Sequence, residues 1–386
     1  MNKSDLGFVV KSFIIWRILI FLPIFLSKYF FELQKNFLGG GFLNYIKNPY
    51  FWSWANFDGE HYISIAKMGY GNGEQAFFPL YPYLIRLVSD LYGFKNPDLL
   101  IATGIFISNV AFFMALIGLF KLISLDYSKR IAKSAIIFLL VFPTSFYFAG
   151  VYTESLFLML VVWSFYFFRQ GNYLLAGLLG ASSTASRVVG IVLMPIFLFS
   201  SYRYKLPLSR SIFSIMFVPL GLLGYMYYGF ITWGNPLQFF TSAAGFGEQR
   251  SEHLIILPQV FYRYFVKIIP NLTWDYFPVI FTTLLELTTA IVFLAMIFFL
   301  FYHLIREKKL FRSDYWLYLT IGFLIPTLSG SFSSLPRYVL ALFPAFIYFA
   351  MYSQKLNKYI LLGIYLGLAI IAVIAQMLFV RGYFVS

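Results

Sequence analysis

Long apolar runs separated by short basic segments dominate the chain. About eleven of these runs predict membrane-crossing helices, because a full span needs roughly 20 apolar residues. The predicted spans lie at about 8–26, 99–122, 135–149, 156–168, a broken pair over 173–201, 212–231, 277–303, 315–328, 339–352 and 359–379. The pattern predicts an all-α polytopic membrane protein in which residues 1–386 form one integral-membrane domain.

The run at 173–201 is too long for one comfortable span and carries Arg187 near its middle. A single helix would leave Arg203 and the basic residues after it outside the cell, against the bias of basic residues toward cytoplasmic loops. Two short helices that meet near 186–187 restore that bias. This arrangement places Arg187 at an outer tip.

The distribution of basic residues also predicts the topology. Lys3 and Lys11 hold the N-terminus in the cytoplasm, and the same rule places two long segments outside, at about 27–98 and 232–275. The first is large enough to contain juxtamembrane helices. We therefore expect a multi-pass protein of the plasma membrane with its polar chemistry on the extracytoplasmic side.

Composition agrees with a bilayer as the main environment. The sequence is 60% hydrophobic and 11% charged, whereas soluble domains carry about 25% charged residues. The net charge of +14 would suggest nucleic acid in a soluble chain, but here the bases lie mostly in short loops, where they set topology and contact lipid headgroups. We therefore expect no nucleic-acid partner.

Several reaction classes are disfavoured by missing residues or motifs. The chain has no cysteine, which excludes disulfides, thiolate metal sites and cysteine nucleophiles. No GxxxxGK[ST], HExxH, GxSxG or Rossmann turn occurs in a suitable setting, so an ATPase or a zinc protease of the HExxH type is disfavoured. DxD is absent too, and we predict neither a metal site nor a cofactor.

The stretch 52–82 is a polar island within the first external segment. Asp58, His61 and Tyr62 are spaced i, i+3, i+4, so they share one face if the segment is helical. A carboxylate beside an imidazole next to a membrane span suits catalysis. Alternatively, Asp58 only caps a short helix on the membrane surface. The two roles are compatible, and spacing leaves both open.

Four further charged residues need an explanation, because a charge at bilayer depth costs at least ~2.5–3.5 kcal/mol. Glu154 either serves the chemistry or complements a helix dipole in its outer turn. Arg187 binds a phosphate or extends to the interface, and Arg337 has the fork geometry for phosphate or carboxylate. For Arg17, inside the first span, we favour pairing with a carbonyl or another helix.

All candidate catalytic groups except Arg17 are predicted on the outer side: Asp58, His61, Glu154, Arg187, Glu248, Arg250, His253 and Arg337. Such a set suits a phosphorylated lipid donor and a hydroxylated acceptor. A carboxylate can take the proton of the attacking hydroxyl, and arginines can stabilise the leaving phosphate. Flat surfaces for a sugar are offered by Trp52, Trp54, Trp233 and Trp274. Outer aromatics are, however, more often interfacial belt residues.

At this point the residues match a known pattern. FDGEHYISIAKMGY followed by AFFPLYP resembles the outer loop of the PIG-V-type mannosyltransferases, in which WD-x-x-H-[FY]-x-x-IA-x-x-GY precedes AFFP-x-x-P. VYTESLFLML resembles the next outer turn and span of that family. SSTASRVVGIVLMPIFLF, SSLPRYVLALFPAFIYF and RGYFVS resemble segments of its prokaryotic members. Phe57 departs from the usual Trp before the Asp.

The resemblance implies a GT-C fold and an inverting glycosyltransferase. Its donor would be a polyprenyl-phosphate sugar, dolichyl- or undecaprenyl-phosphate mannose, and its acceptor a lipid, a glycan or a protein. Asp58 would be the general base, His61 would orient it or contact the donor phosphate, and Glu154 would support catalysis or bind the acceptor.

The remaining assignments depend on chemistry and topology more than on motifs. Arg187 and Arg337 are candidates for the donor phosphate. Substrate contacts are expected from Glu60, Tyr62, Trp54 and Tyr152. Two other functions stay open: a lipid-linked glycan ligase or polymerase, and a transporter or flippase.

Overall fold

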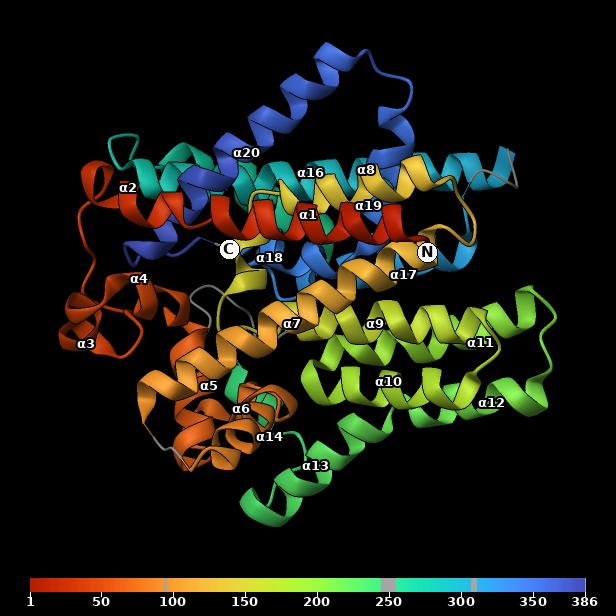
Figure 1. Cartoon of the computed structure of the whole chain (residues 1–386), viewed down its shortest axis with the longest axis horizontal. Helices are drawn as coiled ribbons and strands as arrows, with labels where there is room; N and C mark the ends of the chain where they lie inside the picture. The colour runs from red at the N-terminus through yellow and green to blue at the C-terminus, as the bar shows by residue number, and fades with distance from the viewer. Residues whose placement is uncertain (94–95, 244–254, 307–310, 386) are drawn as a thin grey trace.

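The computed structural model describes residues 1–93, 96–243, 255–306 and 311–385, and all regular elements among them are helical (Figure 1). In chain order the helices are α1 (Lys3–Leu19), α2 (Leu22–Phe30), α3 (Gly41–Lys47), α4 (Pro49–Trp52), η1 (Ser53–Ala55), α5 (Asp58–Met68), η2 (Glu74–Ala76), α6 (Leu80–Leu91), α7 (Pro97–Ile123), α8 (Lys129–Leu140), η3 (Ser145–Ala149), α9 (Glu154–Arg169), α10 (Tyr173–Ser186), η4 (Val188–Val192), α11 (Leu193–Arg203), α12 (Leu208–Phe217), α13 (Leu220–Trp233), α14 (Gln238–Ala243), α15 (Leu257–Tyr262), η6 (Arg263–Ile268), η7 (Ile269–Asn271), α16 (Phe277–Arg306), α17 (Ser313–Thr327), α18 (Leu335–Tyr338), η8 (Val339–Ala341), α19 (Phe343–Ser353) and α20 (Lys358–Val380).

The apolar character of the helices confirms the all-α membrane class. Within the described ranges, five helical stretches are long and apolar enough to cross a bilayer: 3–30, Pro97–Ile123, 208–233, Phe277–Arg306 and Lys358–Val380. A sixth is obtained if α18–η8 and α19, which meet at 82°, count as one bent span. The total of eleven crossings stays a prediction, because several of the other helices are short.

A glycine in the sequence explains the helix break within 173–201. The predicted break near Arg187 is confirmed: α10 ends at Ser186 and Arg187 is extended, with φ −155° and ψ 139°. A Cβ at Gly190 would lie 2.7 Å from the Thr184 backbone nitrogen, so the chain can turn back this tightly only with glycine there.

The predicted third span at 135–149 was wrong in its extent, because α8 ends at Leu140. Pro143 lies just beyond this end and has no backbone N–H to continue a helix. The Ser145 hydroxyl donates to the Leu140 carbonyl at 2.8 Å, satisfying one acceptor at the helix terminus. The chain then forms the 3₁₀ turn η3 before α9 begins.

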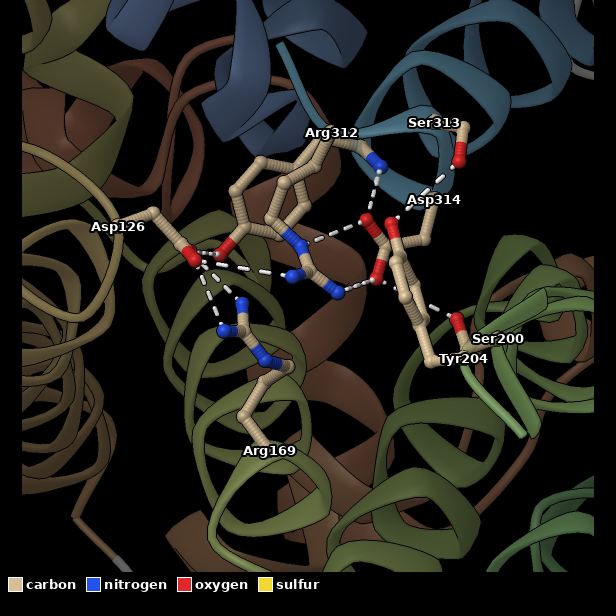
Figure 2. A network of polar contacts seen from close by, with 8 residues as sticks. Asp126, Arg169, Ser200, Tyr204, Arg312, Ser313 and Asp314 are labelled. Carbon is tan, nitrogen blue, oxygen red and sulfur yellow. Dashed lines mark hydrogen bonds and ion pairs between the residues drawn. The ribbon is translucent and has the colours of Figure 1, made fainter. Parts of the chain in front are cut away.

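A network of charges ties several helix ends together (Figure 2). Arg169, at the end of α9, donates to both Asp126 carboxylate oxygens at 2.7 and 2.8 Å. Arg312 binds Asp314 in the same bidentate way at 2.9 and 2.7 Å, and its Nη1 lies 3.6 Å from Asp126. Since Glu154 begins α9 and Arg169 ends it, the network lies about 22 Å from Glu154 at ~1.5 Å rise per residue.

The short helices of the first predicted external segment, α3 to α6, gather at the other end of the molecule (Figure 1). They confirm the expectation of helices between the first two apolar spans. The backbone N–H of Val151, in the turn between η3 and α9, donates to the Trp54 carbonyl at 2.9 Å. The Tyr152 hydroxyl donates to the Asn56 carbonyl at 2.6 Å. These bonds join the segment before Asp58 to the turn before Glu154.

Candidate active site

Asp58 is the first residue of α5, and a strained residue precedes it. Phe57 has φ 55° and ψ −122°, a conformation that residues with a side chain rarely adopt and that costs about 1–3 kcal/mol. Its N–H donates to the Phe37 carbonyl at 3.0 Å, and its ring packs 5.6–5.8 Å from the rings of Phe37, Phe379 and Phe384. Three aromatic contacts therefore fix the direction in which α5 starts.

The Asp58 carboxylate pairs with Arg337. Nη1 of Arg337 donates to Oδ2 of Asp58 at 2.5 Å, with the two side chains 9% and 29% exposed. Phe57 occupies the N-cap position, and no side-chain capping bond is made there. Asp58 is therefore not the N-cap residue of α5, and its carboxylate pairs with Arg337.

Arg337 is held from several sides on the short helix α18. The Thr144 hydroxyl donates to the Pro336 carbonyl at 2.6 Å, which fixes the start of this helix against the turn after α8. The guanidinium lies 5.3–5.6 Å from the ring centres of Tyr147, Tyr152 and Tyr338. The three tyrosines thus surround a desolvated cation with polarizable faces.

Glu154 is the second acid of the site. Its Oε1 accepts from Nη1 of Arg187 at 2.7 Å and lies 3.5 Å from Nε of Arg337. Its Oε2 is buried and has no hydrogen-bond partner among the residues that the structure describes. The Arg187 guanidinium also lies 5.0 Å from the ring centre of Tyr338. Glu154 therefore balances both arginines, beyond complementing the dipole of α9.

Four candidates from distant parts of the sequence thus form one chain of charges: Asp58, Arg337, Glu154 and Arg187. Their formal charges sum to zero, which is how a low-dielectric site tolerates ions. The strong desolvation of Arg337 and Glu154 makes each pair sensitive to the loss of its partner. A ligand that brings one negative charge can enter by accepting hydrogen bonds from the guanidinium N–H groups, in competition with the two acids.

His61 has a carboxylate partner of its own. Its Nδ1 lies 3.3 Å from Oε1 of Glu74, and its ring stacks on Phe77 with centres 4.9 Å apart. Although burial raises the pKa of Glu74, the bonds from His61 and from the Gly71 N–H (2.8 Å) hold that pKa below its usual range. Glu74 thus orients the imidazole and joins α5 to the glycine-rich turn.

The predicted substrate contacts separate into two groups. Glu60 is exposed, whereas Trp54, Tyr62 and Tyr152 are 3%, 7% and 1% exposed. Burial, together with the negative charges of Asp58 and Glu154, raises the pKa of Tyr62 far above its usual value, so its hydroxyl stays neutral. The three buried residues offer little surface to a sugar, and we assign them a supporting role.

Of the two pairings expected for Arg17, with a carbonyl or with another helix, the described residues show the second, through Trp54 in η1. Its guanidinium lies 4.5 Å from the ring centre of Phe21 and 4.9 Å from that of Trp54, and Nη1 is buried without a hydrogen bond. It thus supports the segment before Asp58 through cation–π contacts. Glu248, Arg250 and His253 lie outside the described residues.

Two residues near the site were missed by sequence reasoning. Glu286 is a buried acid within α16, and Tyr264 in η6 donates to it at 2.6 Å. The signal for Glu286 was present, because an acid inside an apolar run is expensive and marks a function. Within the described ranges, no three His, Asp or Glu side chains are grouped so that they could hold a metal ion.

Comparisons with known proteins give the family and the fold. A family model described as mannosyltransferase (PIG-V) matches residues 7–220. The apo crystal structure of the oligosaccharyltransferase of Archaeoglobus fulgidus aligns with a TM-score of 0.52 at 15% identity, covering 99% of this chain and 56% of that one.

The same enzyme tethered to an acceptor peptide with an NVT sequon gives 0.50 at 12% identity, covering 100% and 56%. This chain therefore spans little more than half of the oligosaccharyltransferase chain. At these identities the likeness shows the fold alone, a GT-C fold. The curated proteins give no match.

Proposed function

Because the chain belongs to the PIG-V mannosyltransferase family, we propose that it transfers a hexose, specifically mannose, from a polyprenyl-phosphate donor to a hydroxyl group. Dolichyl- or undecaprenyl-phosphate mannose is the donor in this proposal. The acceptor is a lipid, a glycan or a protein. The observation that carries the proposal is the neutral chain of two acids and two arginines beside the family's acidic motif.

In the proposed reaction, the acceptor oxygen attacks C1 of the sugar while Asp58 takes the hydroxyl proton. The bond between C1 and the phosphate oxygen breaks on the opposite face, and its electron pair leaves with the polyprenyl phosphate. The anomeric centre is therefore inverted. Asp58 suits the base role because it is the more exposed acid of the cluster, at 29% against 4% for the Glu154 side chain.

Arg337 and Arg187 bind the donor phosphate in this proposal and stabilise the charge that develops as it leaves. Arg337 is already engaged by Asp58 at 2.5 Å. A donor phosphate that accepts from Nη1 weakens this pair and frees a lone pair on the Asp58 carboxylate. Donor binding would thus activate the base, and Glu154 would keep both guanidiniums oriented during the exchange.

We place the site on the extracytoplasmic side of the plasma membrane. The basic segments around Lys129 and Arg203 lie at the far ends of α8 and α11, whose other ends lead into the turns that contact the site. The bias of basic residues toward cytoplasmic loops supports this orientation. His61, fixed by Glu74, would face the donor or the acceptor from α5.

The experiment that tests the function is a transfer assay with purified protein in lipid vesicles. Radiolabelled undecaprenyl- and dolichyl-phosphate mannose are offered with panels of lipid, glycan and peptide acceptors. Label that moves to an acceptor, or slowly to water, with inverted stereochemistry supports the proposal. Consumption of a diphosphate-linked oligosaccharide instead would replace it with the glycan ligase. Movement of intact donor across the vesicle membrane without cleavage would indicate a flippase.

A further inference from the structure

We propose that Glu286 and Tyr264 form a positioning pair that sets the place of Arg337, and hence the affinity for the donor phosphate. The inference rests on the proposed role of Arg337. Neither residue touches the Arg337 side chain in the described contacts; both hold the turn from which α18 begins.

The pair consists of an acid and a phenol that satisfy each other in an apolar setting. Glu286 is 8% exposed and Tyr264 is 2% exposed. The Tyr264 hydroxyl donates to Oε2 of Glu286 at 2.6 Å, a distance typical of a strong bond to a carboxylate. An acid at this place within α16 is expensive unless it performs a task.

Glu286 and Tyr264 support the backbone of the turn 331–334, which precedes α18. The Phe332 N–H donates to the Tyr264 hydroxyl at 3.2 Å, and the Glu286 carboxylate lies close to the Ser334 backbone N–H. The Ser331 hydroxyl lies close to Tyr264 and accepts from the Ser333 N–H at 3.0 Å. Tyr264 thus supplies an acceptor for an N–H group that would otherwise lack a partner just before a helix, and Glu286 orients the Tyr264 hydroxyl.

The turn needs such support because its backbone is strained. Ser334 has φ 66°, in the left-handed region that glycine favours, and it is the N-cap residue of α18. The Arg337 N–H in turn donates to the Ser334 carbonyl at 3.1 Å. The position of the guanidinium is therefore fixed through three residues of backbone that begin at the Glu286 contact.

The arrangement couples the second predicted external segment to the site. Tyr264 belongs to that segment, and Arg263 beside it donates to the Gly330 carbonyl at 3.1 Å. Any movement of η6 changes the support of the turn that carries Arg337. The segment thus influences donor binding without contributing a group that contacts the phosphate.

The test compares Glu286→Ala, Glu286→Gln and Tyr264→Phe in the transfer assay, with Thr289→Ala as a control for a buried polar side chain on α16. Hydrogen bonds to a charged group are worth a factor of about 10 or more, so Glu286→Ala raises the donor KM roughly tenfold and leaves the acceptor KM unchanged. Glu286→Gln keeps an acceptor oxygen and stays within about threefold of wild type, as does the control.

A double-variant cycle shows whether the effect passes through Arg337. In an Arg337→Gln background, measured as donor binding, Glu286→Ala causes less than about a twofold further loss, because residues that act as a unit are not additive. Equal rises of both KM values, or effects that multiply in the cycle, would overturn the positioning role.

A substrate-free measurement separates this inference from the proposed function. Glu286→Ala and Asp58→Asn are combined, and their unfolding temperatures in detergent are compared. If the wild type consumes no polyprenyl-phosphate sugar, the function fails, while non-additive unfolding temperatures still support Glu286 acting through the Arg337–Asp58 pair. Additive shifts in an active enzyme would overturn the positioning role alone.

Discussion

The substitution Asp58→Asn separates two consequences of the Asp58–Arg337 pair. Asparagine has the shape of aspartate and keeps an oxygen that can accept from Nη1 of Arg337. In the wild type this nitrogen lies 2.5 Å from Oδ2 of Asp58. It lacks the negative charge and cannot take a proton at neutral pH. Turnover and donor affinity should therefore change in opposite directions.

The magnitudes follow from the geometry. Loss of a positioned general base lowers kcat by about 10²–10⁴-fold, or ~3–5 kcal/mol in the activation barrier. Asp58 is 29% exposed, so its competition with the donor phosphate for Arg337 is screened by solvent. Such a pair is worth about 1 kcal/mol at most, and neutralising it tightens donor binding by up to about fivefold.

The assay measures single-turnover transfer and donor binding on the same vesicle preparation, with Asp90→Asn as the control. Asp90 is an exposed acid on α6 within the same external segment. Full transfer by Asp58→Asn would refute the base role. Weaker donor binding together with slow transfer would show that Asp58 holds the site together and is not the base.

Three further predictions concern the neighbours of the pair. Glu154→Gln leaves Arg187 without its counter-ion and lowers the unfolding free energy, measured by denaturation in detergent, by about 3 kcal/mol. This value is the low end for a buried pair, because Arg187 is 15% exposed. Unchanged stability would mean that the pair is not formed. Phe57→Trp keeps the aromatic packing and stays active. Phe57→Ala leaves the strained residue unsupported and slows transfer roughly tenfold or more, while circular dichroism shows an unchanged fold. Equal activities of the two variants would contradict the role of the ring. Because the pKa of Glu74 is lowered in the folded protein, Glu74 contributes folding stability above pH 4.5 that is lost as the pH falls through its folded pKa. A pH series of thermal unfolding measures this dependence of the unfolding temperature on pH. Glu74→Gln should abolish the dependence, and a dependence that persists would exclude the His61 contact as its origin.

Sequence reasoning succeeded where a local property fixes the answer. Apolar run length predicted the helical membrane class. The charge bias around Arg187 predicted a helix break, which is possible because Gly190 lets the chain pack closely against the end of α10. Sequence reasoning failed at 135–149, where the apolar run continues through Pro143 but the helix ends at Leu140 because proline has no backbone N–H. The acidic motif around Asp58 identified the family from order and spacing alone.

The partners in the site could not be predicted in this way. Asp58 and Arg337 are separated by 279 positions and Glu154 and Arg187 by 33, so no spacing rule relates them. Spacing placed His61 and Asp58 on one face of α5, and the structure adds a contact of His61 with Glu74 in the following turn, which spacing on α5 does not predict. Trp54 and Tyr152 were predicted to face substrate, but packing buries them.

The sequence by itself therefore determined the apolar or polar character of each segment, the helical class, the break near Arg187 and the chemical types in the polar segments. These properties depend on single residues and their near neighbours. The tertiary structure alone decided which charges neutralise one another and which residues hold them. Pairing in a low-dielectric site depends on distances between segments, and here bonds such as Tyr152 to Asn56 and Thr144 to Pro336 set those distances.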